Sequence, residues 1–175
     1  DQPRSRGLGD VYKRQVENPD YKIRSNMMDY FLNSEITLFY KFSTIITDDY
    51  TIFCNEGFYD PQKKIGVFKK DAKVNSESRT IFGDSIFFDE NKKYASASRN
   101  IKIIDEKENL IIKGEYAEVF EELDSALITK NPVAINITKT DSLFIKADTL
   151  ISLGTSQNRK VICLLYTSPS PRDRG

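Results

Sequence analysis

The 175-residue chain contains no histidine and no tryptophan, and it has only two cysteines. Without histidine, the chain cannot form a Ser–His or Cys–His catalytic pair, and it has no imidazole ligand for zinc. The glycine-rich patterns GxxxxGK[ST] and GxGxxG, which bind phosphate groups and dinucleotides, are also absent. We therefore expect a protein that is not an enzyme, with no catalytic residue, no metal site and no cofactor.

Long apolar runs are missing as well, and none approaches the roughly 20 residues that a membrane-spanning helix needs. The chain therefore predicts no membrane span in this fragment. Carboxylates are plentiful, but Asp60, Asp89 and Asp105 lie in clusters of turn-forming residues. At such places we expect solvated turn residues and not a catalytic acid–base pair. The isolated Cys54 is expected to be a small buried hydrophobic residue.

The two ends of the chain resemble translated sequencing-library adapter. Residues 5–15 read SRGLGDVYKRQ and residues 163–173 read CLLYTSPSPRD, and their back-translations are essentially reverse complements of each other. We therefore interpret residues 1–15 and 163–175 as adapter-derived tails, and residues 16–162 as one domain truncated at both ends. This domain has 20 basic and 23 acidic residues, so its composition predicts no excess of positive charge that would bind nucleic acid. A signal peptide would lie outside the fragment.

A repeat of about 29 residues runs through the domain. Sliding the chain by 29 positions places Thr51-Ile52-Phe53 on Thr80-Ile81-Phe82 and Lys63-Lys64 on Lys92-Lys93. The signature is an isoleucine, any residue, a small residue and then an acidic or amide residue. Its five copies begin at Ile23, Ile52, Ile81, Ile112 and Ile145, with spacings of 29, 29, 31 and 33. Equal steps of this length are typical of stacked structural units that cover one another.

Apolar residues alternate with polar ones in several runs, which predicts β-strands with one covered and one wet face. Turn-forming clusters recur at matching places between these runs. The signature isoleucines are expected to face inward. The small residues lie two positions after these isoleucines, so they should face the same side of each strand and form a second column. They are Ser25, Cys54, Gly83, Gly114 and Ala147. Two interpretations of this column stay open: it leaves room for a ligand or a bend, or it lets two sheet walls pack closely.

The stretch from Gly83 to Glu118, GDSIFFDENKKYASASRNIKIIDEKENLIIKGEYAE, resembles the OstA-like (LptA) family of lipopolysaccharide-transport proteins. A weaker likeness extends over residues 20–162. The resemblance implies an all-β fold of antiparallel strands in an open, twisted β-jellyroll, and a protein that carries lipopolysaccharide across the periplasm of a Gram-negative-type bacterium. It also implies an apolar groove for acyl chains, and extension by edge-strand addition to other β-jellyroll transport proteins.

The alternation and the repeat together define a candidate set of inward residues that would contact lipopolysaccharide or another acyl lipid. They are Ile23, Leu38, Tyr40, Ile52, Val67, Ile81, Ile101, Ile103, Ile112, Ile135 and Ile145. Two alternatives remain open. One is a structural or adhesive β-solenoid with a filled core and no ligand. The other is the N-terminal domain of an LptD-type outer-membrane assembly protein.

Overall fold

The computed structural model describes residues 14–138, 140–154 and 159–165, and every regular element in these ranges is a β-strand. β-Branched and aromatic residues alternate with polar ones along the chain, which favours extended strands. The backbone N–H and C=O groups of these strands hydrogen-bond to neighbouring strands. The strands are β1 (Arg14–Asn18), β2 (Tyr21–Ser25), β3 (Met28–Tyr30), β4 (Thr37–Phe39), β5 (Ser43–Thr47), β6 (Thr51–Cys54), β7 (Glu56–Asp60), β8 (Ile65–Asn75), β9 (Arg79–Asp89), β10 (Tyr94–Asp105), β11 (Leu110–Phe120), β12 (Ser125–Thr129), β13 (Val133–Ile137), β14 (Ser142–Lys146), β15 (Thr149–Gly154) and β16 (Arg159–Leu164).

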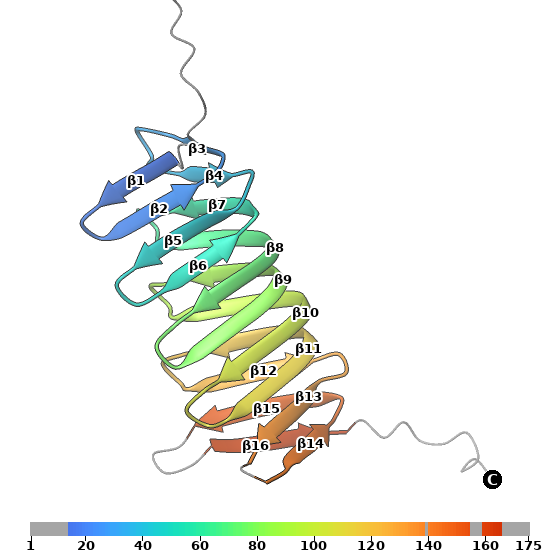
Figure 1. Cartoon of the computed structure of the whole chain (residues 1–175). Coiled ribbons are helices and arrows are strands. Elements are labelled where there is room, and N and C mark those ends of the chain that lie inside the picture. The colour runs from blue at the N-terminus through green and yellow to red at the C-terminus, as the bar shows by residue number, and fades with distance from the viewer. Residues whose placement is uncertain (1–13, 139, 155–158, 166–175) are drawn as a thin grey trace, which may run out of the picture.

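The strands form one open antiparallel sheet that is folded into two facing walls (Figure 1). Wall A consists of β1, β2, β5, β6, the halves of β8–β11 that contain residues 72–75, 79–83, 101–105 and 110–114, and then β13 and β14. Wall B consists of β3, β4, β7, the other halves of β8–β11, and then β12, β15 and β16. This arrangement confirms the predicted all-β, open jellyroll class.

The long strands pass from one wall to the other through a bend that recurs with the sequence repeat. At the bends of β8 and β10, and at the connection from β12 to β13, two consecutive residues have left-handed φ angles: 58° and 60° at Lys70-Asp71, 62° and 51° at Arg99-Asn100, and 61° and 58° at Lys130-Asn131. The strand pairing shifts register at the first two bends, as in a β-bulge. The bends are 29 and 31 residues apart, which are two of the spacings of the signature isoleucines. The structural repeat and the sequence repeat are therefore the same.

The acidic or amide position of the repeat signature also lies at the bends. The Asn55 side chain donates to the Lys70 carbonyl at 2.9 Å, and the Asn100 amide donates to both oxygens of Asp84 at 3.0 and 3.1 Å. These short polar side chains hydrogen-bond the backbone or one another where the sheet turns. Asn55 and Asp84 of the signature therefore stabilise the corner of the sheet.

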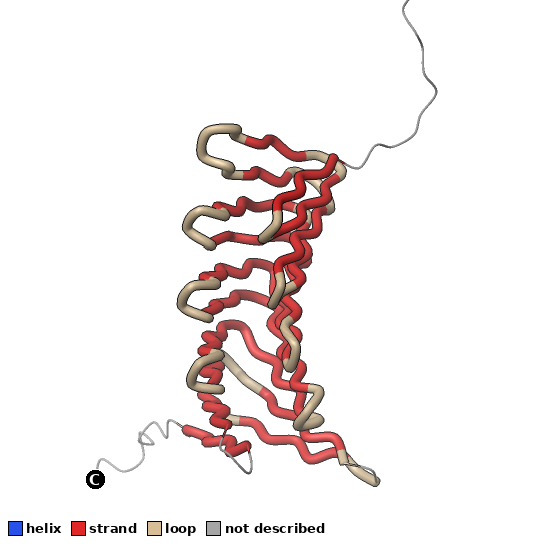
Figure 2. The backbone as a smooth tube through the Cα atoms, turned by 90° about the vertical axis from the view of Figure 1, so that its left-hand side faces the viewer, coloured by secondary structure: helices blue, strands red, loops and turns tan. Residues whose placement is uncertain are grey.

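Turns connect the strands at the ends opposite the bends, and they form one row along each wall (Figure 2). Asp60 and Asp89 accept hydrogen bonds from the backbone N–H groups of Lys63 and Lys92 at 3.0 Å, and Asp105 does the same for Glu108 at 3.2 Å. The expectation that these three aspartates are solvated was wrong, because all of them are buried. Each carboxylate folds back onto its own turn and satisfies a donor there.

Apolar side chains between the walls form one continuous core. Ile23, Ile52, Ile81 and Ile112 are buried in it, and Ile145 packs against it half-buried. The small residues lie beside the bends, where the walls converge: a Cβ added to Gly83 would lie 3.4 Å from Ala97 Cβ, and one added to Gly114 would lie 2.6 Å from Ile128 Cγ2. The structure thus favours close packing of the walls as the reason for the small column.

Most residues of the two predicted tails lie outside the described residues. The exceptions are Arg14 and Gln15, which lie in β1, and the stretch 163–165, of which Cys163 and Leu164 lie in β16. Within the described ranges, no helix has the length and apolar character needed to cross a bilayer.

Candidate functional site

The space between the walls is the candidate site, because the predicted groove residues converge on it. Seven of the eleven predicted residues point into this space from wall A. Six are buried, at most 3% exposed, and Ile145 packs against them. The seven are Ile23, Ile52, Ile81, Ile101, Ile103, Ile112 and Ile145. Wall B supplies the opposite lining with Phe39, Phe68, Ile86, Phe88, Val119 and Ile128.

The other four residues of the predicted set point outward, so their assignment to the groove was wrong. On β4 the buried residues are Thr37 and Phe39, which places Leu38 on the outer face and leaves Tyr40 exposed beyond the strand. On β8 and β13 the inward positions beside Val67 and Ile135 are taken by the neighbouring residues. Those neighbours include Phe68 and the small Ala134. Alternation identifies a strand but does not say which face is covered when both faces carry apolar residues.

The interior is filled by its own side chains. One slot between the walls, lined by Val74, Ile81, Phe88 and Val119, has no room for a water molecule. A second slot, lined by Ile103, Leu110, Ile112 and Ala126, has a volume of about 10 Å³. A single water molecule needs at least roughly 10–15 Å³. An acyl chain could therefore occupy this interior only if the walls separated.

The walls meet along a seam on the side opposite the bends, and side chains close this seam. The Tyr50 hydroxyl of wall A donates to Glu121 Oε2 of wall B at 2.6 Å, and the Tyr21 hydroxyl donates to Glu35 Oε2 at 3.3 Å. The Tyr50 ring also packs edge-on against Phe88, with 4.7 Å between centroids. Burial, together with the hydrogen bond to the Glu121 carboxylate and its charge, raises the pKa of Tyr50. The tyrosine is therefore held neutral, as a donor to that carboxylate.

A network of two arginines and two aspartates closes the seam nearer the C-terminal end. Arg79 of wall A pairs with Asp105 of the same wall, at 3.3 Å, and with Asp124 of wall B. Arg159 of wall B contacts the same two aspartates: its Nη2 lies 3.2 Å from Asp105 Oδ2 of wall A and 2.7 Å from Asp124 Oδ1 of wall B. The side chains of Arg79, Arg159 and Asp105 are buried, whereas Asp124 is half exposed. Alternating charges therefore connect the two walls.

The electrostatics of Asp124 follow from this network. Burial alone would raise the pKa of Asp124, but the hydrogen bond from Arg159 and the charges of Arg79 and Arg159 outweigh it and lower the pKa below its usual value. Asp124 therefore stays ionised and paired at neutral pH.

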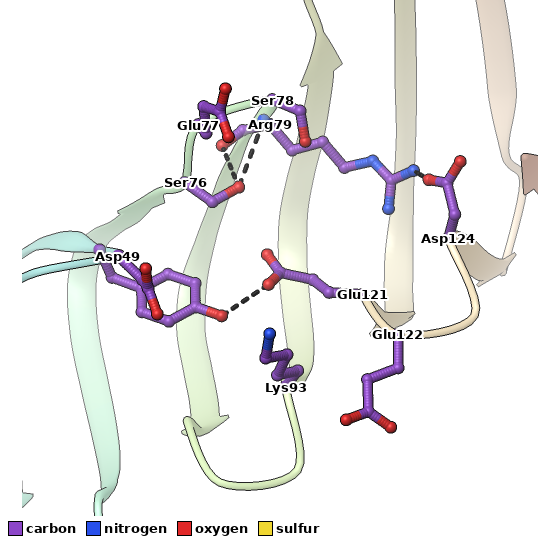
Figure 3. Close-up of a pocket in the computed structure, with 10 residues that line it drawn as sticks. Asp49, Ser76, Glu77, Ser78, Arg79, Lys93, Glu121, Glu122 and Asp124 are labelled. Carbon is purple, nitrogen blue, oxygen red and sulfur yellow. Dashed lines mark hydrogen bonds and ion pairs between the residues drawn. The ribbon is translucent and has the colours of Figure 1, made fainter.

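A polar depression of about 290 Å³ lies on the seam, between the Tyr50–Glu121 contact and the arginine network. Figure 3 shows Arg79 reaching across it to Asp124, and the Lys93 side chain pointing its amine toward Glu121. Among the described residues, no backbone hydrogen bond joins a turn of wall A to a turn of wall B. The seam can thus part by breaking side-chain contacts alone, without breaking the strand pairing.

Sequence reasoning missed every one of these seam contacts. Arg79, Asp124 and Arg159 stand in no recognisable motif, and Asp105 was interpreted only as a turn residue. One usable signal was present: Arg79 begins an apolar-alternating run at an inward position, where an arginine requires a buried partner. In the described ranges, no cluster of three or more metal-ligating side chains is found.

Comparison of the sequence with protein-family models and with curated proteins finds no significant match to this chain.

Proposed function

We propose that this protein is a lipid carrier that takes the acyl chains of lipopolysaccharide, or of a similar lipid, between its two walls in the periplasm. The observation that carries the proposal is a continuous apolar interior bounded on one side by a seam that only side chains close. Chains would enter laterally through the seam, while the bends act as the hinge. The repetition of the unit lets one acyl chain contact equivalent side chains along the stack.

The energies favour opening on lipid binding. Burying an acyl chain of a dozen carbons is worth about 10 kcal/mol. The four polar contacts across the seam, at about 1–2 kcal/mol each, together oppose opening by about 4–8 kcal/mol. Apolar side chains that move away from the opposite wall would pack against the acyl chain instead. The interior can therefore be filled when empty of lipid and still accept a lipid.

Edge strands supply the second part of the proposal. Among the described residues, β1 and β3 on one side of the stack and β14 and β16 on the other each pair with a single strand, which leaves their second edges open (Figure 1). Exposed edges of this kind favour strand addition from a neighbouring β-jellyroll protein. Addition at either end would extend the apolar interior from one molecule to the next.

Site-specific photocrosslinking tests the lipid proposal. A photoreactive amino acid placed at Ile81 or Ile112 should form an adduct with lipopolysaccharide, because both side chains face the interior. Phe87 and Phe120 point outward from the wall B halves of the same strands and are matched controls. Labelling of all four positions to the same extent would contradict an interior lipid site.

The filled interior also favours a second candidate, a structural or adhesive β-solenoid that binds no ligand. Under this alternative, the same crosslinking experiment would give no lipid adduct at Ile81 or Ile112.

A further inference from the structure

From β2 to β14, the flat part of the outer face of wall A combines cations with apolar side chains and carries no carboxylate. On each of its strands from β2 to β14, two side chains point outward in the flat part of the wall, between bend and turn. None of these is Asp or Glu. The cations are Lys22, Arg24, Lys73, Lys102, Lys113 and Lys146. Acidic residues elsewhere in the domain balance these cations, so the net charge does not reveal them. The expectation of no basic field therefore describes the overall composition but not this surface.

The side chains of this face are ordered by strand pairing. Phe53, Lys73, Phe82 and Lys102 are direct cross-strand neighbours in that order. The Lys73 amine lies 5.4 Å from the centroids of both phenyl rings, and the Lys102 amine lies 5.7 Å from that of Phe82. Neighbouring strands are about 4.8 Å apart, so these groups form a continuous stripe. A parallel row adds the apolar Ile104, Ile111, Ile135 and Phe144.

Two of the cations repel each other. Lys102 and Lys113 are directly opposite on β10 and β11, an arrangement that destabilises a sheet. Of the six cations, Lys22 alone has an ion pair within 4 Å in the described part of the chain, with Glu17 at 2.7 Å. The carboxylates Asp71, Asp84 and Glu115 are confined to the bend margin. An unneutralised row of this kind is complementary to a partner that brings negative charge.

A depression of about 400 Å³ lies where this face meets the bends. Lys102, Lys113 and Lys130 line it, together with Asn100 and Asn131 and the single carboxylate of Glu115. Three ammonium groups and two amides are suited to hold a phosphate group.

We propose that the outer face of wall A docks on the surface of a membrane that contains anionic phospholipid. The lysines and Arg24 contact the phosphate headgroups, the depression seats one of them, and the outward phenylalanine and isoleucine side chains enter the interfacial region. The apolar side chains between the cations favour a bilayer over a soluble anionic polymer, because only the bilayer offers them an apolar environment. Docking in this way leaves the seam on the opposite margin of the wall accessible.

Vesicle flotation with the full chain tests this proposal. Vesicles of phosphatidylcholine with one quarter phosphatidylglycerol should bind the protein at 50 mM salt, and binding should fall at 500 mM salt. Replacing Lys73, Lys102 and Lys113 by glutamine should weaken binding on the order of a hundredfold. The matched control replaces Lys63, Lys64 and Lys92, which lie on turns of wall B, and should bind like the unchanged chain. The cations of residues 1–15 are present in both variants.

Three results would overturn the proposal: no binding to the anionic vesicles, equal binding to vesicles of phosphatidylcholine alone, or equal loss in the two lysine variants. Lysine-dependent binding to soluble polyglutamate without vesicle binding would instead assign the face to an acidic protein partner. Circular dichroism of both variants controls for folding. The interior lipid site uses none of these residues, so its crosslinking result is independent of this outcome.

Discussion

Replacing Arg79 by methionine tests whether the buried charge network holds the walls together. Methionine keeps most of the apolar stem of arginine but removes the guanidinium group. Its removal leaves the buried Asp105 with Arg159 as its only charged partner, and it disconnects Asp124 from wall A. The side chains of Arg79 and Asp105 are only 5% and 6% exposed, so solvent cannot compensate for the missing partner.

Breaking a buried ion pair from one side destabilises a protein by about 3–5 kcal/mol. Because Arg159 Nη2 remains 3.2 Å from Asp105, we expect the lower end, a decrease of about 3 kcal/mol in the free energy of unfolding. For a domain of this size the melting temperature should fall by about 6–12 °C. Urea unfolding at pH 7, followed by circular dichroism, measures the free energy directly.

Arg99→Met is the matched control. Arg99 Nε lies 3.8 Å from Asp84 Oδ2, and its side chain is 71% exposed. Such a surface pair contributes about 0–1 kcal/mol. Adding Asp105→Asn to Arg79→Met should recover part of the loss, because the amide retains a hydrogen-bond acceptor for the Glu108 N–H group and leaves no poorly paired buried charge. Equal destabilisation by Arg79→Met and Arg99→Met would refute the role of the network.

Three further predictions concern stability at low pH, the backbone at the bends and the reactivity of the two thiols. The pKa of Asp124 is lowered in the folded chain, so the ionised carboxylate stabilises the fold above about pH 4, and this stabilisation is lost as the pH falls further. The difference in free energy of unfolding between the unchanged chain and Asp124→Asn, measured by urea titration, should therefore shrink below about pH 4. Asp71→Gly should stabilise the chain by about 0.5–1 kcal/mol in the same assay, since it relieves a left-handed φ of 60°, whereas Asp71→Ala should not. Burial raises the pKa of Cys54 to about 12, so a thiol reagent should label the exposed Cys163 alone in the native chain and both cysteines in denaturant; fast native labelling of Cys54 would contradict its burial.

The repeat was the part of the fold that the sequence predicted best. Side chains that recur every 29 residues occupy equivalent backbone positions, because each stacked unit must present the same shape to the next. The left-handed residues Glu35, Lys64, Lys93 and Asp124 follow this rule in the turns of wall B, at spacings of 29, 29 and 31. The left-handed residue pairs at the bends were not predicted, since Lys70-Asp71 and Arg99-Asn100 contain no glycine to mark a left-handed backbone.

The direction of individual side chains was less predictable than the strands that carry them. Leu38, Val67 and Ile135 alternate correctly, yet their neighbours face the core, because the walls of this sheet carry apolar residues on both sides. The seam contacts were beyond reach for another reason. Tyr50 and Glu121 are 71 positions apart, and Arg79 and Asp124 are 45 apart, so only the folded arrangement of turns brings them together.

The polar contacts between the walls are distributed unevenly, which is compatible with the opening that we propose for lipid entry. On the bend side, the walls are continuous through the backbone of β8–β11, and the packing around Gly114 is too tight to admit another group, since an added Cβ would lie 2.6 Å from Ile128 Cγ2. On the seam side, the walls depend on contacts such as Tyr50–Glu121 and Arg79–Asp124, each of which water can replace once the side chains separate. The opening that we propose for lipid entry would therefore be a rotation about the bends. A substitution that weakens the seam should ease separation of the walls without disturbing the repeat.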